Sequence, residues 1–291
     1  MRAAIVSHAL SDTNHALALH GFGEVPVEVL NPREALLGLV RGDVALVRLD
    51  VSADLDGVEE GLWAVDRLQN AGVHILNRPE ALLAAHDKLL TSRLLRRAGL
   101  PHPRTVLVQR HAPAPDLDFP AVVKPRFGSW GRDVTLCRDR AELERALEGL
   151  SFRPWFRRTG ALAQELIPPL GYDLRLIVAR GRVVGCARRI AAAGEWRTNV
   201  SLGAEIVSEL PPPLASRLAL EAAEASGLHL VGVDLLPTGP NGFCVIELNG
   251  AVDFRPIYSF PGRNAYADVM DALSEALEPE PQNVALGAVS S

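Results

Sequence analysis

The stretch FPAVVKPRFGSWGRDV (Phe119–Val134) joins a short apolar run to a glycine-rich loop. We predict a strand over AVVKP, because this apolar run ends where the loop begins. Gly128 and Gly131 would let backbone N–H groups of the loop turn towards phosphate oxygens. Lys124 precedes the glycines, whereas the lysine of the GxxxxGK[ST] phosphate loop follows them. This order predicts a flexible lid over phosphates, although many glycine-rich loops are plain turns.

The chain has only two lysines, Lys88 and Lys124, among 30 basic residues. Where only positive charge matters, a chain with this bias should carry arginine. Lysine should persist where a compact ammonium on a slim stem is needed and a planar guanidinium does not fit. We therefore predict that both lysines contact an anionic ligand. The alternative is that two lysines remain by chance on a solvated face.

A second informative stretch is GVDLLPTGPNGFCVIELNG (232–250). Alternation along its second strand places Val245, Glu247 and Asn249 on one face. Asp234, on the preceding strand, would be brought alongside by a hairpin-like return. These oxygen donors suit a magnesium ion that nucleotide phosphates also bind. The alternative, a solvated edge strand, fits poorly with the apolar run FCVIEL.

Several arginines interrupt apolar strands. They are Arg175 in YDLRLIV and Arg188 and Arg189 in GCARRI, and the segment EWRTN then adds Arg197 and Asn199. Burying an arginine is costly unless it meets an anion, so phosphate or carboxylate is the expected partner. Taken singly, each arginine is equally consistent with a surface residue whose charged end reaches solvent.

The first part of the chain alternates strands with a helix, which predicts an α/β layer with a parallel sheet. The predicted strands are 2–7, 43–50 and 73–77, with a helix over 58–72. No GxGxxG follows the first strand, which argues against a dinucleotide-binding domain. A leucine-rich helix then ends at Gly99 before two prolines, so we place the first domain boundary near residues 84–100.

The remainder reads as α+β lobes. Strands are predicted in TVLVQR, AVVKP, ALAQELIP and GFCVIELNG, a hairpin in YDLRLIVARGRVVGCARRI, and helices in DRAELERALEGL and PPLASRLALEAAEASGL.

Bulk properties exclude several classes of protein. The net charge of −5 argues against nucleic acid as the main partner. No run approaches about 18 apolar residues and the N-terminus lacks a signal-peptide core, so we expect a cytoplasmic protein without membrane contact. Cys137, Cys186 and Cys244 form no CxxC pair and are expected to be buried, inert thiols.

Taken in order, HDK, VVKPRFGSWGR, QELI, DLR, RTN, GVDLL and IELN resemble the ATP-grasp superfamily, in its RimK-like branch of carboxylate–amine ligases. The resemblance covers roughly residues 75–275. It implies an α/β protein with α+β lobes, an ATP-grasp fold preceded by a Rossmann-like pre-ATP-grasp domain. The implied divisions are 1–84 for the pre-ATP-grasp domain, 85–163 for a central lobe with the lid, 164–278 for a C-terminal lobe with the metal site, and 279–291 for a loose tail.

The same resemblance implies roles for individual residues. Those implied to contact ATP are Lys88, Lys124, Arg197 and Asn199 at the phosphates, Gly128, Ser129, Trp130 and Gly131 in the lid, Gln164, Glu165, Leu166 and Ile167 in a hinge whose backbone reads the adenine edge, and Glu165 and Asp173 along the adenosine. Asp234, Glu247 and Asn249 are implied to hold two magnesium ions, with manganese as an alternative. Arg175, Arg189 and Asn249 are implied to be catalytic, the arginines stabilising the transferring phosphoryl group. Arg188 is the weaker candidate because it points away from Arg189 on a strand.

The implied reaction is ADP-forming ligation. ATP converts a carboxylate into an acyl phosphate, an amine attacks, and phosphate leaves, so no covalent enzyme nucleophile is needed. GSWGR, EWRTN and the pair Asp253-Phe254 most resemble LysX-type ligases of amino-acid biosynthesis, which add α-aminoadipate or glutamate to a small acidic amino-group carrier protein. The arginines that would dock such a partner are Arg126, Arg132, Arg153, Arg157 and Arg158, although a solvated arginine-rich face is an equal alternative.

Two departures leave the substrate open. VSLGAE stands where the family commonly has an Arg-Gly-Gly segment, and GAVDFRPIYSFPGRN is not a close copy of the carrier-ligase form. A small-molecule or natural-product peptide acceptor therefore remains an alternative to a carrier protein. So do a non-catalytic ATP-binding regulator and, more remotely, a phosphotransferase. A homo-oligomer is compatible with the family, but the sequence does not specify one.

Overall fold

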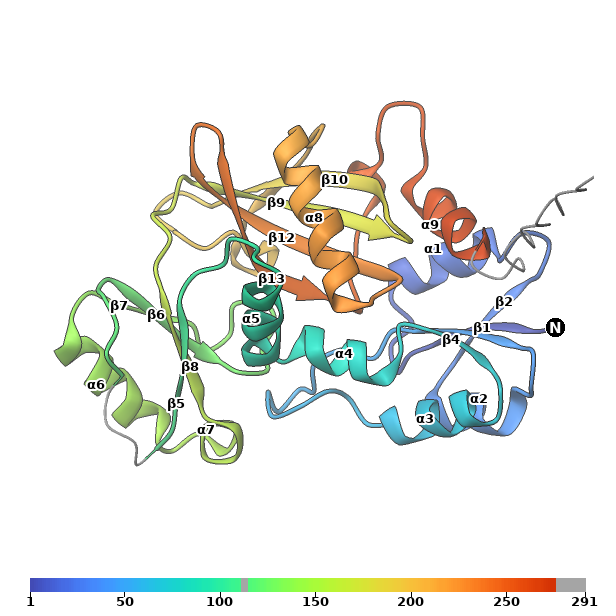
Figure 1. Cartoon of the computed structure of the whole chain (residues 1–291), viewed down its shortest axis with the longest axis horizontal. Helices are drawn as coiled ribbons and strands as arrows, with labels where there is room; N and C mark the ends of the chain where they lie inside the picture. The colour runs from blue at the N-terminus through green and yellow to red at the C-terminus, as the bar shows by residue number, and fades with distance from the viewer. Residues whose placement is uncertain (111–114, 276–291) are drawn as a thin grey trace, which may run out of the picture.

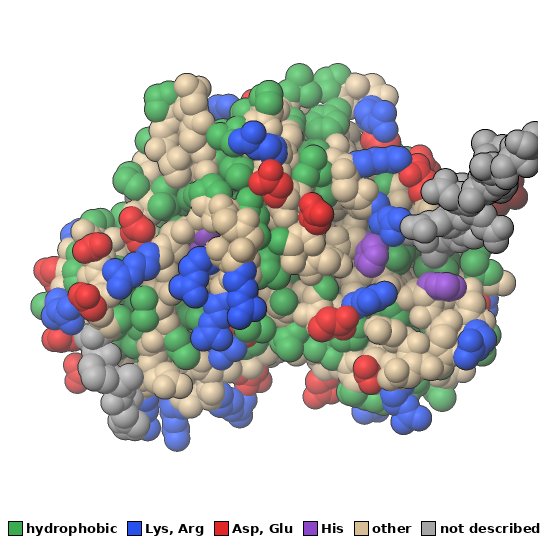
Figure 2. Space-filling view, in the orientation of Figure 1, with side chains coloured by type: hydrophobic (Ala, Val, Ile, Leu, Met, Phe, Trp, Pro, Cys, Tyr) green, Lys and Arg blue, Asp and Glu red, His purple; other side chains and the backbone are tan. Residues whose placement is uncertain are grey.

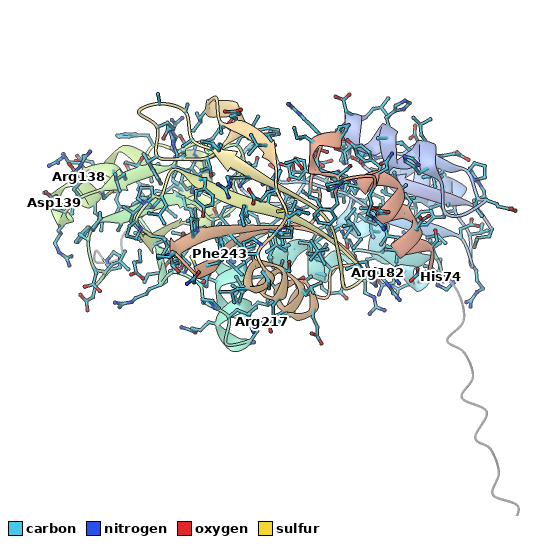
Figure 3. The ribbon with its side chains drawn as sticks, turned by 90° about the horizontal axis from the view of Figure 1, so that it is seen from above. His74, Arg138, Asp139, Arg182, Arg217 and Phe243 are labelled. Atoms are coloured by element: carbon cyan, nitrogen blue, oxygen red, sulfur yellow. The ribbon has the colours of Figure 1, made fainter. Side chains whose placement is uncertain are left out.

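The computed structural model describes residues 1–110 and 115–275, which form three sheets within those ranges (Figure 1). The predicted loose tail, 279–291, lies outside the described residues. His74, in the N-terminal sheet, and Arg138 and Asp139, in the central lobe, lie at opposite ends of the molecule (Figure 3). The largest sheet lies between these two ends, so both smaller parts can contribute side chains to its surface.

The N-terminal sheet is parallel throughout, with strand order β2-β1-β3-β4. Its strands are β1 (Ala3–Val6), β2 (Val27–Leu30), β3 (Val44–Val47) and β4 (His74–Leu76), connected by the helices α1 (Asp12–His20), α2 (Pro32–Gly38) and α3 (Leu62–Asn70). Helices on both faces bury β1 and β3 completely, which is why these strands are continuous apolar runs. The predicted parallel layer is confirmed, and β2, α1 and α2 are additions to it.

The leucine-rich segment before the linker is two helices, α4 (Pro79–His86) and α5 (Lys88–Arg97), where we predicted one. The break lies at Asp87, whose backbone is extended and whose carboxylate accepts the N–H of Leu89 at 3.0 Å. An aspartate at this position satisfies donors that a new helix would leave unpaired, so it starts α5. Lys88 thereby becomes the first residue of α5.

The central lobe is an antiparallel sheet of order β5-β8-β6-β7 with two short helices. Its elements are β5 (Thr105–Val108), β6 (Ala121–Pro125), β7 (Thr135–Cys137), α6 (Arg140–Leu150), α7 (Pro154–Thr159) and β8 (Ala161–Glu165). Lys124 lies near the end of β6, as predicted, and the glycine-rich loop connects β6 to β7. The sequence did not indicate α7.

The C-terminal lobe is an antiparallel sheet of order β11-β10-β9-β12-β13. Its elements are β9 (Tyr172–Ala179), β10 (Arg182–Ile190), the 3-10 turn η1 (Val200–Leu202), β11 (Glu205–Ser208), α8 (Pro213–Ser226), β12 (Leu230–Gly239), β13 (Gly242–Asn249), the turn η2 (Pro256–Tyr258) and α9 (Ala265–Ser274). The β9–β10 and β12–β13 hairpins confirm two predictions. They place Arg175, Arg189, Asp234 and Glu247 on adjacent strands.

The apolar core joins the N-terminal and C-terminal parts of the chain. One cluster combines Val6 and Val47 with Leu176, Leu218 and Val233. The central lobe has a core of its own around Leu143 and Trp155, which Leu55 of the N-terminal domain enters. The three cysteines are free and buried, as predicted, and burial raises the pKa of Cys186 to about 12. Among the described helices, none has the length and apolar character needed to span a membrane.

Candidate active site

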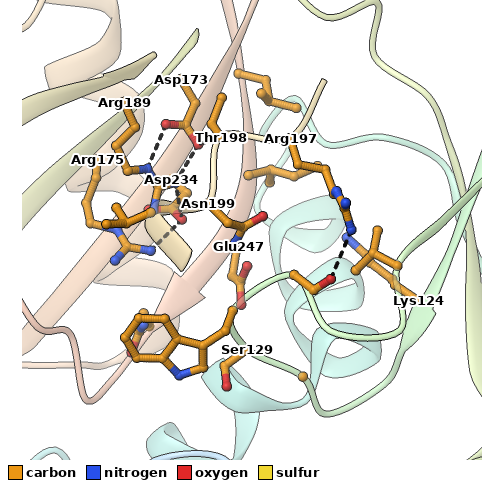
Figure 4. Close-up of a pocket in the computed structure, with 18 of the residues that line it drawn as sticks. Lys124, Ser129, Asp173, Arg175, Arg189, Arg197, Thr198, Asn199, Asp234 and Glu247 are labelled. Atoms are coloured by element: carbon orange, nitrogen blue, oxygen red, sulfur yellow. Dashed lines mark hydrogen bonds and ion pairs between the residues drawn. The ribbon is translucent and has the colours of Figure 1, made fainter. Parts of the chain in front are cut away.

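A cavity of about 460 Å³ lies where the three parts of the chain meet. Every residue that we assigned to ATP, metal or catalysis lines it, from Lys88 on α5 to Asn249 on β13. Figure 4 shows side chains of this set, among them Lys124, Arg175 and Asp234, converging from both lobes. Arg188 is the exception among the strand arginines, because it pairs with Glu209 at 2.9 Å and lies over the Tyr172 ring outside the cavity.

Lys124 is buried, with 8% of its surface exposed. Its ammonium donates to Oε1 of Gln164 at 2.7 Å, and Gln164 donates in turn to the hydroxyl of Thr105 at 2.7 Å. Gln164 therefore aims the lysine into the cavity. Burial, assisted by the charge of Lys88, lowers the pKa of Lys124 to about 8. A slim ammonium fits this site, and an anionic ligand would raise the pKa of Lys124 towards its ordinary value.

Lys88 connects the glycine-rich loop to β13. Its ammonium lies 2.8 Å from Oε1 of Glu247 and also donates to the carbonyl of Gly128. The preceding residue, Asp87, accepts from Nε of Arg126 at 2.8 Å. Arg126, which we considered for partner docking, is instead committed to this pair.

Asp234 lies between two arginines. Arg175 donates to both of its oxygens at 2.7 and 2.8 Å, and Arg189 donates to Oδ2 at 2.8 Å. Burial alone would raise the pKa of Asp234, but these guanidinium groups outweigh it and hold that pKa well below its ordinary value. Asp173 is buried behind Arg189, which it binds, and accepts the Thr198 hydroxyl at 2.6 Å. Its contacts orient Arg189, and its place along the adenosine stays a prediction.

A β-bulge on β13 changes the predicted facing of its side chains. Asp234 pairs with Glu247 but Leu235 pairs with Val245, so Ile246 is the extra residue. Val245 consequently packs into the core with Leu248, and our assignment of Val245 to the polar face was wrong. Glu247 and Asn249 do line the cavity.

The donor set fits magnesium. Asp234, Glu247 and Asn249 offer carboxylate and amide oxygens, which hard cations prefer. Within the described ranges no group of three or more His, Cys, Asp or Glu side chains forms a potential metal cluster. Two carboxylates and one amide leave coordination positions for phosphate oxygens, so the set suits a metal that arrives with a nucleotide.

The lid rests on the segment that follows β10. Arg197 donates to the carbonyl of Gly131 at 3.2 Å, and Ser201 donates to the carbonyl of Trp130 at 2.9 Å. Gly131 has φ +69°, and a Cβ there would lie 2.8 Å from Oδ1 of Asn199. Glycine is therefore required for the loop to approach Asn199 this closely. Arg197 is itself oriented by Glu195, and hydrogen bonds from Arg197 lower the pKa of Glu195 to about 2.

The predicted hinge, Gln164–Ile167, borders the cavity at the end of β8. The N–H of Leu166 donates to the carbonyl of Pro120 at 3.1 Å, and that of Glu165 donates to Arg104 at 2.9 Å. No backbone hydrogen bond of the Ile167 N–H occurs within the described ranges. This donor is consequently the one suited to an adenine edge.

The sequence interpretation missed the contribution of the N-terminal domain. Ser11, Asp12 and Thr13, which follow β1, and Asp50, which follows β3, line the same cavity. Ligands of α/β sheets bind outside the carboxyl ends of parallel strands, so the position of these residues was an available signal. Asp253 and Arg255, which follow β13, also line this cavity.

The arginines considered for docking an acidic partner are largely engaged within the chain. Arg153 lies 3.2 Å from Asp133, Arg158 pairs with Asp56, and Arg132 donates to Ala53 at 3.5 Å. Basic side chains do gather over α5 in Figure 2, where the sequence has Arg93, Arg96 and Arg97. For Arg132, Arg153 and Arg158 the structure thus favours contacts within the chain.

Comparison with known families gives a match to the RimK-like ATP-grasp domain over residues 85–273. The chain belongs to this family. A glutamate–LysW ligase ArgX of Sulfurisphaera tokodaii is 30% identical over 75% of this chain and 76% of its own length. A tetrahydromethanopterin:α-L-glutamate ligase of Methanosarcina acetivorans is 31% identical over 80% of each chain.

The fold agrees with this family. A RimK-domain ATP-grasp protein of Sphaerobacter thermophilus superposes with a TM-score of 0.65 and 22% identity, over 94% of this chain and 99% of that one. The RimK-like chain is therefore an ATP-grasp enzyme that joins a carboxylate to an amine at the expense of ATP. ATP-grasp ligases use ATP and Mg²⁺, which agrees with the donor set described above.

Proposed function

We propose that this enzyme adds glutamate, or a homologous amino acid, to the terminal carboxylate of a carrier protein or peptide through an acyl phosphate. The observation that carries the proposal is the convergence of Lys88, Lys124, two strand arginines and the oxygen donors of β12 and β13 in one cavity. Cations at a developing phosphoryl charge and oxygen ligands for a metal are the parts that phosphoryl transfer needs.

ATP would lie between the central and C-terminal lobes. Ile167 offers a backbone donor for adenine, and the lid from Gly128 to Gly131 covers the phosphates. Lys124 is aimed by Gln164, and Lys88 by its pair with Glu247. Because these four elements come from different segments, closure of the lid would assemble the site and exclude water.

Asp234, Glu247 and Asn249 would hold two magnesium ions, with manganese as an alternative. Magnesium there would neutralise phosphate charge during transfer. Arg175 and Arg189 would exchange part of their bonding to Asp234 for phosphate and acyl-phosphate oxygens. Asp173 and Thr198 would keep Arg189 in place during this exchange.

Two relatives support the choice of substrate, because one is named as a glutamate ligase of LysW and the other as a glutamate ligase of tetrahydromethanopterin. The second of these names supports an alternative acceptor, a small molecule with a free carboxylate. We further propose a cytoplasmic enzyme, the domain divisions given above and, as an alternative to a monomer, a homo-oligomer. Light scattering on the purified protein tests the last point.

The test is ADP release in magnesium buffer with a panel of amino acids, each with and without a synthetic peptide ending in glutamate. Mass spectrometry of the peptide follows. A gain of one amino-acid residue, matched by ADP, supports the proposal and names the substrate. ADP release that requires a small-molecule carboxylate instead favours the alternative acceptor. ATP binding without ADP under any of these pairings would overturn the carrier or peptide acceptor and leave a small-molecule acceptor outside the panel.

A further inference from the structure

An arginine of the N-terminal domain is buried beside the loop that follows β13. Arg48 has 3% of its surface exposed and lies just beyond β3. Its Nη2 donates to the carbonyl of Val252 at 2.9 Å and to Oδ1 of Asp253 at 3.1 Å, and its Nε donates to Oδ1 of Asn14. The remaining nitrogen, Nη1, is buried with no hydrogen-bond partner within the described ranges.

Burying a guanidinium with an unused donor is unfavourable, so a buried arginine of this kind needs a reason. The core does not require it, because backbone carbonyls such as that of Val252 can be satisfied by neutral donors. The charged partner that Arg48 meets is Asp253. This pair joins the N-terminal domain to the cavity wall only four residues after Asn249.

Asp253 is held on one side and open on the other. Its Oδ1 accepts from both Arg48 and the hydroxyl of Ser11, the latter at 2.9 Å. Its Oδ2 has no hydrogen-bond or ion-pair partner among residues 1–110 and 115–275, and half of the side chain is exposed. A carboxylate fixed through one oxygen presents the other in a defined direction. Asp253 lines the active-site cavity, so that direction is available to a substrate.

Charge at this end of the cavity matches an amino acid. Arg255, two residues beyond Asp253, also lines the cavity and makes no side-chain hydrogen bond or ion pair within the described part of the chain. A carboxylate and a guanidinium on the wall of one cavity complement the ammonium and carboxylate groups of one zwitterion. Asp253 and Arg255 follow Asn249 closely in the sequence and line the same cavity, so an amine held by Asp253 would lie near the proposed phosphate and metal site.

We propose that Asp253 binds the α-ammonium group of the incoming amino acid and that Arg48 is the positioning residue that fixes Asp253 for this contact. Arg255 binds a carboxylate of the same molecule. This inference rests on the proposed function, because it takes an amino acid as the amine substrate. It extends that function by naming the residues that select for an amino group.

The test compares two ligands that differ only in that group. The full-length enzyme, loaded with magnesium and a non-hydrolysable ATP analogue, is titrated calorimetrically with L-glutamate and with glutarate, which lacks the amino group. L-α-aminoadipate and adipate form a second such pair. We expect the wild-type enzyme to bind the amino acid with a dissociation constant at least about tenfold lower, because one hydrogen bond between charged groups contributes a factor of this size.

Asp253→Asn, which keeps the shape of the side chain, should reduce that preference to within about twofold, with unchanged affinity for the ATP analogue. Arg48→Met should do the same, and Arg48→Lys should restore part of it. The matched control is Arg255→Gln, which should weaken both members of a pair equally and keep the preference. A change that merely loosened the fold would not remove discrimination selectively.

The outcomes separate this inference from the proposed function. A wild-type enzyme without preference for the amino acid, or an Asp253→Asn enzyme that retains it, overturns the inference even if turnover is observed. Absence of ADP with every amino acid and acceptor overturns the proposed function, whereas these titrations need no turnover. If Arg48→Met lowers the melting temperature severely, Asp253→Asn alone decides.

Discussion

Nζ of Lys88 lies 2.8 Å from Oε1 of Glu247, so a predicted phosphate ligand and a predicted metal ligand are paired with each other. Asp234 is likewise held by Arg175 and Arg189. Both carboxylates of the oxygen set are thus already neutralised by cations of the chain. Nucleotide phosphates would draw these cations away and free the oxygens.

Magnesium binding should therefore depend on nucleotide. We expect Mg²⁺ alone to change the melting temperature little, and Mg²⁺ with ADP to raise it by more than the sum of the separate effects. Thermal melting with each ligand and with both checks this. Equal magnesium affinity with and without ADP would mean that the ion pairs do not compete with the metal.

Glu247→Gln should abolish ligation while leaving the fold intact. The amide keeps the size of the side chain but loses the charge that holds a metal, and we expect turnover to fall at least about 100-fold. ADP release and melting temperature are the measurements. The control is Glu275→Gln, which breaks an exposed pair with Arg182 remote from the cavity and should leave turnover unchanged. Normal turnover in Glu247→Gln would remove Glu247 from the metal site.

ATP affinity should fall at alkaline pH because of Lys124. Because the pKa of Lys124 is about 8, its amine is protonated and charged below this pH and loses its charge as the pH rises through 8. Binding of phosphate needs the charged form, so the dissociation constant should rise about tenfold per pH unit above 8. Calorimetric titration with the ATP analogue between pH 7.5 and 9.5 measures it.

Lys124→Arg is the matched variant, because guanidinium stays charged over this range. It should bind ATP more weakly at pH 7.5, since the planar group does not fit beside Gln164, and show no loss at higher pH. Parallel profiles for the two enzymes would assign the alkaline effect to another group.

Gly131→Ala should prevent the lid from seating. A Cβ at this position meets Asn199 at 2.8 Å, and the residue has a positive φ. We expect KM for ATP to rise about tenfold, since lost closure removes the lid's contribution to binding. Gly99→Ala is the control, because Gly99 also has a positive φ but no atom lies within 4 Å of its Cβ position. It should lower the melting temperature without changing KM; a similar KM effect in both variants would argue against a specific lid contact.

The order of the motifs predicted much of the site. Short segments such as QELI, DLR and IELN each carry their functional side chains on or next to a strand of the observed sheets. All residues assigned to ATP, metal and catalysis accordingly line one cavity. The scarcity of lysine in the chain drew attention to Lys88 and Lys124. The structure supports the physical reason, since Lys124 is buried and its ammonium is held by Gln164.

Local patterns failed where partners distant in sequence decide. Asp87 divides the long helix because Arg126 and the first N–H groups of α5 both use its carboxylate. Val245 leaves the polar face because the register between β12 and β13 shifts there. The register shift has no signature within a single segment, and the cap at Asp87 was masked by the continuous helical spacing of the leucines around it.

The sequence by itself determined the parallel N-terminal layer, the strands that carry the arginines and oxygen donors, and the glycines of the loop after β6, because these depend on periodicity and on backbone freedom at single positions. Only the tertiary structure decided which charges meet. Whether Asp234 pairs with Arg175, Lys88 with Glu247, or Arg48 with Asp253 depends on side chains from 59 to 205 positions apart approaching within hydrogen-bond distance. Electrostatic interactions of this kind fall with distance in space and not with separation along the chain.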